Sequence, residues 1–207
     1  MHARSTNIHA DPARIDDGVR YLREQVLPDL AAADGCYGLS ALTDRETGRV
    51  IVATAWADKE AMRATAEEVR PTRHRLEHMV GGRHSDVHEW EIAVLHRDRM
   101  AGDGAGAQVT WARIPADHVD GLLDAYRLNL LPRLRELPGF CSVSLLVDRR
   151  AGRTVSVTSF DSREAIALVR RQAWFLREQF ARAMGARILD VQEMDLALAH
   201  LRVPETV

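Results

Sequence analysis

The sequence has few of the features that mark several large classes of protein. Its two cysteines, Cys36 and Cys141, are too few for a disulfide framework, and free thiols of this kind suit a reducing cytoplasm. No stretch approaches the ~18 consecutive apolar residues of a membrane-spanning helix, and residues 1–14 lack the apolar segment of a secretory signal. Lys59 is the only lysine, and the formal net charge is -2, so charge gives no case for nucleic acid. We therefore expect a cytoplasmic protein with no nucleic-acid partner and no membrane partner.

What the sequence does contain is an internal repeat, which registers without a gap at a shift of 104 residues, as from Asp44 to Asp148. About a quarter of the paired positions are identical, and the period is the length of a small domain. Between the copies, the glycines of AGDGAGAQ mark a flexible linker. The predicted organisation is a first unit over residues 1–98, a glycine-rich linker over 99–107 and a second unit over 108–207.

Each copy carries the pattern β-α-β-β-α-β, which is the ferredoxin-like order. In the second copy, apolar residues recur at intervals of three and four after Pro115, which predicts a helix that Pro132 kinks or ends early. Ser162 is the expected cap of a second helix, as Asp58 is in the first copy. The strands expected in the second copy are 108–114, 141–147, 153–160 and 191–199, and the expected helices are 115–134 and 163–184.

The expected strands carry apolar residues at both odd and even positions, as in the pairs Ile51 with Val52 and Leu145 with Leu146. Such strands are typical of a sheet that is buried on both faces. The helices of a ferredoxin-like unit cover only one face, so the other face needs a second sheet. We therefore predict that the repeat exists because the chain supplies its own pairing partner.

The segments that carry the repeat resemble a known family. They are the helix-ending Pro138-Gly139-Phe140, a hairpin with Asp and then Gly four residues on, and the motif Trp56, Asp58, Glu60, Ala61. Together they resemble the antibiotic biosynthesis monooxygenase-type domains of the dimeric α+β barrel superfamily, over nearly the whole chain. The resemblance implies an α+β fold in which two tandem ferredoxin-like units form an intramolecular dimeric barrel.

The resemblance also implies a function, the cofactor-independent oxidation of a small aromatic or polyketide-like molecule. Such chemistry needs an aromatic wall, donors for a developing oxyanion and a base. No cofactor is then required, the partner is a small aromatic ligand, and the protein is a monomer by internal pairing or a homodimer. Two alternatives stay open: a non-catalytic small-molecule-binding or structural barrel, and a relative that binds or degrades haem.

Several residues are candidates for that site. The catalytic candidates are His74 on the second helix, Asn7 on the first strand and Trp56 at the end of the third. Arg73 and Arg177 occupy the same position in the two copies and could hold a carboxylate or phenolate. Each candidate also has a plainer interpretation, as a core aromatic or as part of a solvated helix face. The aromatic candidates for substrate binding are Trp111, Phe160 and Trp174.

The histidines gather in the first copy, where His74 and His78 share a helix face and His84 and His88 follow. Their spacing matches no zinc motif, so we predict no metal site. Haem-degrading relatives combine an Asn on the first strand with a Trp and a His on the second helix. Thr65 and Arg75 stand at those helix positions here, so the haem alternative departs from its family pattern.

Overall fold

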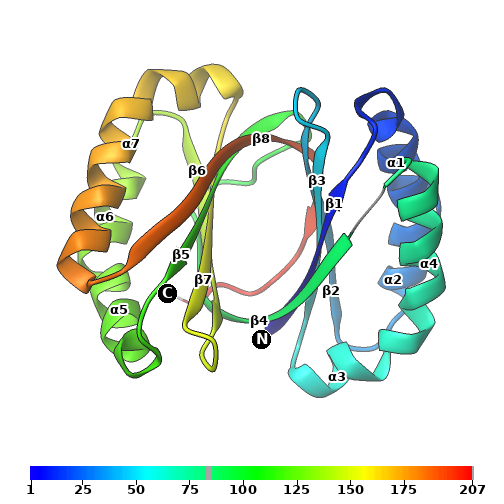
Figure 1. The fold of residues 1–207 in the computed structure, drawn as a ribbon, viewed down its shortest axis with the longest axis horizontal. Helices are drawn as coiled ribbons and strands as arrows, with labels where there is room; N and C mark the ends of the chain where they lie inside the picture. The colour runs from blue at the N-terminus through cyan, green and yellow to red at the C-terminus, as the bar shows by residue number, and fades with distance from the viewer. Residues whose placement is uncertain (83–84, 207) are drawn as a thin grey trace. The chain divides into compact units, whose positions relative to one another are not determined.

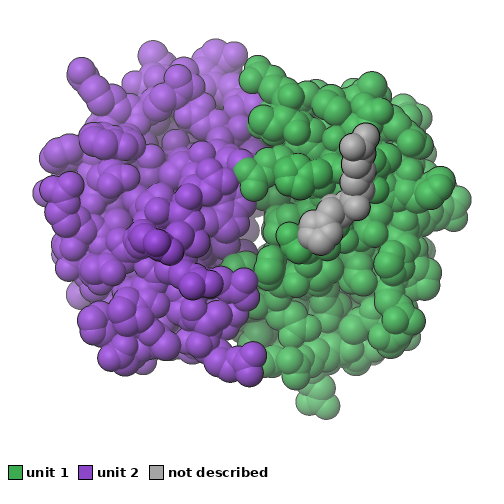
Figure 2. Space-filling model, viewed as in Figure 1, with its two compact units in different colours: residues 1–90, 195–203 green, residues 91–194, 204–207 purple. Residues whose placement is uncertain are grey.

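A computed structural model describes residues 1–82 and 85–206, and in it each copy of the repeat folds as β-α-β-β-α-β (Figure 1). The chain divides into two compact units, residues 1–90 with 195–203 and residues 91–194 with 204–207 (Figure 2). These ranges differ from the expected segments because the last strand of each copy contributes residues to both units. Among the described residues, no helix is both long and apolar enough to cross a membrane.

In the first unit, helices cover one face of a sheet whose centre is β1, β3 and β2 (Figure 1). The helix-facing side chains form one buried hydrophobic cluster with the helices. The elements are β1 (His2–His9), a short 3-10 turn (Pro12–Arg14), α1 (Ile15–Tyr21), a π turn (Leu22–Val26), α2 (Leu27–Ala31), β2 (Cys36–Asp44), β3 (Arg49–Trp56), α3 (Lys59–Ala64), α4 (Ala66–Met79) and β4 (Ser85–Arg97).

The second unit repeats this arrangement, with α5, α6 and α7 on one face of the sheet centred on β5, β7 and β6. Here a single long helix, α7, replaces the pair α3 and α4. The elements are β5 (Ala105–Arg113), a 3-10 turn (Ala116–His118), α5 (Val119–Ala125), a π turn (Tyr126–Leu130), α6 (Leu131–Arg135), β6 (Phe140–Asp148), β7 (Arg153–Phe160), α7 (Arg163–Met184) and β8 (Arg187–Leu201).

The strand registers repeat at the same 104-residue shift as the sequence. β1 runs antiparallel to β3 with Asn7 opposite Ile51, and β5 runs antiparallel to β7 with Trp111 opposite Val155. The duplication is therefore preserved residue by residue in the backbone pairing. It follows that equivalent side chains point to equivalent faces of the two sheets.

The last strand of each copy is much longer than its neighbours. β4 has 13 residues and β8 has 15, against eight or nine in the other strands. The extra length pairs with a further strand: residues 195–201 of β8 pair with β2, and residues 91–97 of β4 pair with β6. The hydrogen-bonded order β1-β3-β2-β8-β5-β7-β6-β4 is that of a closed barrel, which confirms the predicted fold class.

The helix caps follow the sequence pattern. The side chain of Asp58 accepts a hydrogen bond from the backbone N–H of Ala61 at the start of α3, and Ser162 accepts one from Ala165 at the start of α7. α7 then runs for 22 residues to Gly185, whose φ of 65° is the left-handed conformation that favours glycine. These caps set the ends of the helix that carries Arg177.

The sequence predicts a kink or an early end of the helix at Pro28 and at Pro132, and neither proline ends its helix. The helix instead widens into a π turn just before each proline, where Leu27 N–H bonds to Leu22 O and Leu131 N–H bonds to Tyr126 O. Proline removes one backbone donor, and the wider turn lets the helix continue past that gap.

Candidate functional site

A small cavity lies inside the second unit, between α7, the α5–α6 helix with its π turn, and the helix-facing side of the sheet. Its volume is about 70 Å³, which is room for several water molecules or a small organic group. The walls on the helix side are mainly aliphatic, and the floor on the sheet side is polar. The lining residues used below are Gln108, Thr110, Tyr126, Ser156, Thr158 and Arg177.

The polar floor comes from the two-residue period of β5 and β7. Alternate residues of a strand point to the same face, so Thr154, Ser156 and Thr158 all face the helices, as Gln108 and Thr110 do on β5. A sheet face under a helix is ordinarily apolar, so these hydroxyls distinguish this part of the sheet from the rest of the core.

Arg177 brings a positive charge into this cavity from α7. Its Nη1 donates a 2.7 Å hydrogen bond to Oε1 of Gln108. Its Nε is buried, and none of the residues that the structure describes provides it with an acceptor. Desolvation by burial lowers the pKa of the guanidinium from its ordinary value, because the charged form is less stable away from water. Arg177 therefore lines the cavity with one of its N–H donors unpaired among the described residues.

Tyr126 stands on the π turn and is fully enclosed. Its hydroxyl lies 2.8 Å from Oγ of Ser156, and its ring packs edge-on against Phe180 with ring centroids 5.7 Å apart. Burial raises the pKa of the Tyr126 phenol to about 12, against a smaller opposing effect of the Ser156 hydrogen bond. At neutral pH the phenol therefore keeps its proton, so it can donate a hydrogen bond and is not a base.

The first unit contains the equivalent cavity, of about 60 Å³. Arg73 on α4 lines it at the position that Arg177 has in the second unit. Two other polar groups have changed, since Leu22 and Val52 stand in the places of Tyr126 and Ser156, whereas Thr6 and Thr54 keep the hydroxyls of their counterparts in the second unit. Arg4 replaces Gln108, so this cavity has aliphatic walls and two arginines.

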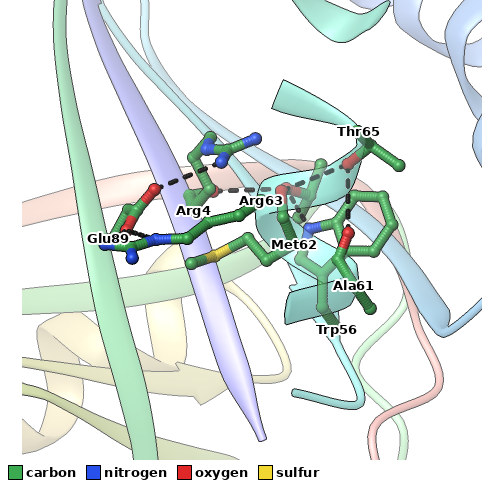
Figure 3. Close-up of polar contacts among 8 residues, drawn as sticks. Arg4, Trp56, Ala61, Met62, Arg63, Thr65 and Glu89 are labelled. Atoms are coloured by element: carbon green, nitrogen blue, oxygen red, sulfur yellow. Dashed lines mark hydrogen bonds and ion pairs between the residues drawn. The ribbon is translucent and has the colours of Figure 1, made fainter. Parts of the chain in front are cut away.

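Arg4 is held by an ion-pair network (Figure 3). Its Nη2 lies 3.2 Å from Oε1 of Glu89, and Nε and Nη2 of Arg63 donate to Oε2 of the same carboxylate at 3.2 and 3.1 Å. The Arg4 side chain is only 8% exposed. Burial alone would raise the pKa of the Glu89 carboxyl, but the hydrogen bonds from Arg4 and Arg63 lower it below its usual value.

Of the residues that the sequence singled out, the two arginines line the cavities and the aromatics mostly do not. Trp56 is fully buried beside the first cavity, where its Nε1 donates a 3.1 Å hydrogen bond to Oγ1 of the lining residue Thr54. Phe160 is a buried core residue, packed edge-on against Phe140 with centroids 6.4 Å apart. Trp174 is 52% exposed on α7 and lines neither cavity.

The remaining candidates are not brought together with these groups. Asn7 and Trp111 alternate with the cavity-lining residues of β1 and β5, so they point to the opposite faces of their sheets. His74 lies on the outer side of α4, with its side chain 64% exposed and its Nδ1 3.3 Å from Oε2 of Glu77. His84 falls outside the described residues, and among those described no group of side chains could hold a metal ion.

Sequence reasoning missed the polar floor of the second cavity and its buried tyrosine. One signal was available: the alternating hydroxyls of Thr154, Ser156 and Thr158 place polar groups on one face of a strand between apolar ones. Tyr126 and Arg4 carried no such signal. Their roles depend on the π turn and on a carboxylate that is 85 residues from Arg4.

The cavities do not fit haem, the ligand of the third interpretation of the sequence. No histidine, cysteine or methionine is among the described residues that line either cavity, and the one lining tyrosine, Tyr126, keeps its proton and is hydrogen-bonded to Ser156. Cavities of about 70 and 60 Å³ are also far below the ~300–1,000 Å³ of typical cofactor and ligand sites. We therefore derive no step through haem.

Two proteins of Mycobacterium tuberculosis strain H37Rv, Rv2557 and Rv2558, are each 47% identical to this chain. Both alignments cover 100% of this chain, and they cover 92% of Rv2557 and 88% of Rv2558. Both proteins are described as uncharacterized, so the likeness brings no activity with it. No protein-family model matches the chain.

Solved structures with the same fold include a candidate monooxygenase of Lactobacillus acidophilus NCFM, with a TM-score of 0.67 at 10% identity over 94% of this chain and 92% of that one. An anthrone oxidase-like protein has a TM-score of 0.59 at 17% identity, over 96% and 95%. A Listeria monocytogenes 4b F2365 ferredoxin-fold protein related to antibiotic biosynthesis monooxygenases has 0.55 at 9%, over 95% and 94%. Identities this low show a common fold and no more.

Proposed function

The chain belongs to one family with Rv2557 and Rv2558 and has the fold of antibiotic biosynthesis monooxygenase-type domains, and from that premise we propose that it oxidises a small phenolic or enolic molecule in the cavity of the second unit. The observation that carries the proposal is the buried Nε of Arg177, without an acceptor among the described residues, in a cavity floored by hydroxyls. The solved structures of the same fold support the class of reaction, since they include a candidate monooxygenase and an anthrone oxidase-like protein.

In the proposed reaction the substrate enters as its oxyanion. Its oxygen accepts a hydrogen bond from Nε of Arg177, and the Tyr126 hydroxyl is the neutral donor nearby. The negative charge delocalises to a ring or methylene carbon, and that carbon bonds to one atom of dioxygen. The peroxide then loses water, and the carbon gains one oxygen as a carbonyl. A methylene carbon gives up two hydrogens in the whole reaction, whereas a ring carbon gives up one and the phenol hydroxyl gives up the other. Dioxygen is the oxidant, and no cofactor takes part.

Arg177 has to provide most of the stabilisation of the oxyanion, because the described lining residues include no His, Asp or Glu that could be a base. A positive charge at ~4 Å stabilises an anion by about 4 kcal/mol at an effective dielectric constant of ~20. That is roughly 3 pKa units before the cost of desolvating the substrate is subtracted. The cavity therefore favours substrates that are already weakly acidic, and their proton leaves to solvent. The prediction that His74 is the base stays a separate hypothesis.

Oxygen uptake with a panel of probes tests the proposal. The panel contains a single-ring dihydroxybenzene, which suits a cavity of about 70 Å³, and a three-ring anthrone. We expect uptake with the smaller probe, lost in Arg177→Met and kept in Arg171→Met, which removes a charge from the exposed side of the same helix. His74→Ala separates the two hypotheses, because loss of uptake in that variant alone would favour the histidine. Probe binding without oxygen uptake would instead favour a non-catalytic binding protein.

A further inference from the structure

The cavity of the first unit has different chemistry from that of the second, because two arginines line it. These are Arg4 and Arg73, and Arg63 shares the carboxylate that contacts Arg4. The carboxylates that contact the lining arginines are Glu89 and Glu77. Neither carboxylate is among the described residues that line the cavity, so the only charged groups in that lining are cations.

Neither lining arginine is saturated by those carboxylates. The buried Arg4 side chain reaches Glu89 through Nη2 alone, although a guanidinium carries several N–H donors. Arg73 approaches Glu77 only to 3.8 Å, at the outer limit of an ion pair, and Glu77 also contacts His74 and Ser85. Each lining arginine therefore has N–H donors beyond its ion pair, and an anion in the cavity could accept from them.

The walls of the cavity define what kind of anion fits. Apart from the arginines and the hydroxyls of Thr6, Thr54 and Thr72, the lining is aliphatic. A phosphate or sulfate would turn some of its oxygens toward hydrocarbon, where they would lack donors. A carboxylate with a short apolar chain has one charged end for the guanidiniums and an apolar end for the wall. The aliphatic residues are Leu22, Val26, Leu30, Leu39, Val52, Val69 and Leu76.

From this chemistry we propose that the first unit binds a short-chain aliphatic carboxylate between Arg4 and Arg73. The site is independent of the oxidation proposed for the second unit, where Gln108 stands in place of Arg4 and hydroxyls replace part of the aliphatic wall. One copy thus has a neutral amide and a phenol beside its arginine, and the other has a second cation. The volume of about 60 Å³ limits the ligand to a few carbons.

Calorimetric titration of the intact protein tests the proposal, with butyrate, butyramide and inorganic phosphate as probes. We expect butyrate to bind, and butyramide to bind at least about tenfold more weakly because it lacks the charge. Phosphate should also bind more weakly than butyrate. Tighter binding of phosphate, or no binding of butyrate by the folded protein, would overturn the proposal.

Variants place the binding in this cavity. Arg73→Met should weaken butyrate binding by tenfold or more, and Arg4→Gln, which copies the second unit, should do the same. Arg70→Met is the matched control, because Arg70 lies on the outer side of α4 in an ion pair with Glu67. Arg177→Met should leave butyrate binding unchanged while it abolishes oxygen uptake, so the two proposals fail separately. If Arg4→Gln does not fold, Arg73→Met decides alone, and equal binding by Arg73→Met and Arg70→Met would refute the site.

Discussion

The buried pair of Tyr126 and Ser156 gives a prediction that can be worked from the structure. Their oxygens are 2.8 Å apart, and the tyrosine is enclosed while the serine is half-buried. Tyr126→Phe removes the hydrogen bond and leaves Ser156 without that partner. A net hydrogen bond contributes about 1 kcal/mol, and a stranded buried group costs ~1–3 kcal/mol, so we expect a loss of about 1–1.5 kcal/mol at this half-buried site. That corresponds to a fall in Tm of roughly 2–6 °C for a chain of this length.

A double-mutant cycle isolates the pair from the rest of the cavity. The first unit already carries apolar residues at both positions, Leu22 and Val52, so a cavity without the pair is compatible with the fold. We therefore expect the double variant Tyr126→Phe/Ser156→Ala to lose less stability than the sum of the single variants, by about 1 kcal/mol. Urea unfolding of the four proteins measures this. Additivity within ~0.3 kcal/mol would refute the assigned hydrogen bond.

The same tyrosine predicts an alkaline limit to stability. Burial raises its pKa to about 12 from the ordinary value of 10.0. A folded-state pKa above the unfolded one gives stability that is complete below pH 10 and falls as the pH rises from 10 toward 12. In Tyr126→Phe that part of the alkaline loss should disappear, and an identical alkaline profile in both proteins would contradict the burial of the phenol.

Two further predictions concern the scaffold of the units. The pKa of Glu89 is lowered in the folded protein, so its contribution to stability is present above its ordinary pKa of 4.5 and is lost as the pH falls below that value. Glu89→Gln should therefore flatten the acid limb of a curve of stability against pH. An unchanged acid limb would count against the ion-pair network. Gly139→Ala should destabilise by about 1–3 kcal/mol, because φ is +82° and the added Cβ would lie 2.6 Å from Cβ of Ala165. Gly121→Ala, in a helix with nothing within 4 Å of the added Cβ, should instead gain up to ~1 kcal/mol, and equal losses at both glycines would contradict the model of the turn.

The fold could be predicted from the sequence because the same order of predicted strands and helices recurs in both copies of the repeat. The hairpin ending in Gly152 and the caps Asp58 and Ser162 are local signals, and the structure places them as expected. The π turn that carries the helix past Pro132 was not predicted from the sequence.

The candidate site was only partly predictable, for a physical reason. Arg177 was found because the repeat pairs it with Arg73, but its partner Gln108 lies 69 residues away on another strand. His74 attracted interest by its chemistry, yet one residue along a helix turns a side chain by about 100° and moves it from the cavity to the outer face. Residue type alone does not say which way a side chain points, so it could not distinguish Arg73, which lines the cavity, from its neighbour His74.

The central claim, that Arg177 stabilises an oxyanion in the second cavity, is tested most directly by the ionisation of a bound phenol. A nitrophenol changes colour when it ionises, so its pKa can be read in the protein by spectrophotometric titration. We predict that binding to the wild-type protein lowers the pKa of the probe by about 1 unit or more, and that Arg177→Met abolishes this shift while Arg171→Met keeps it. A bound probe whose pKa is unchanged or raised in the wild-type protein would contradict the account.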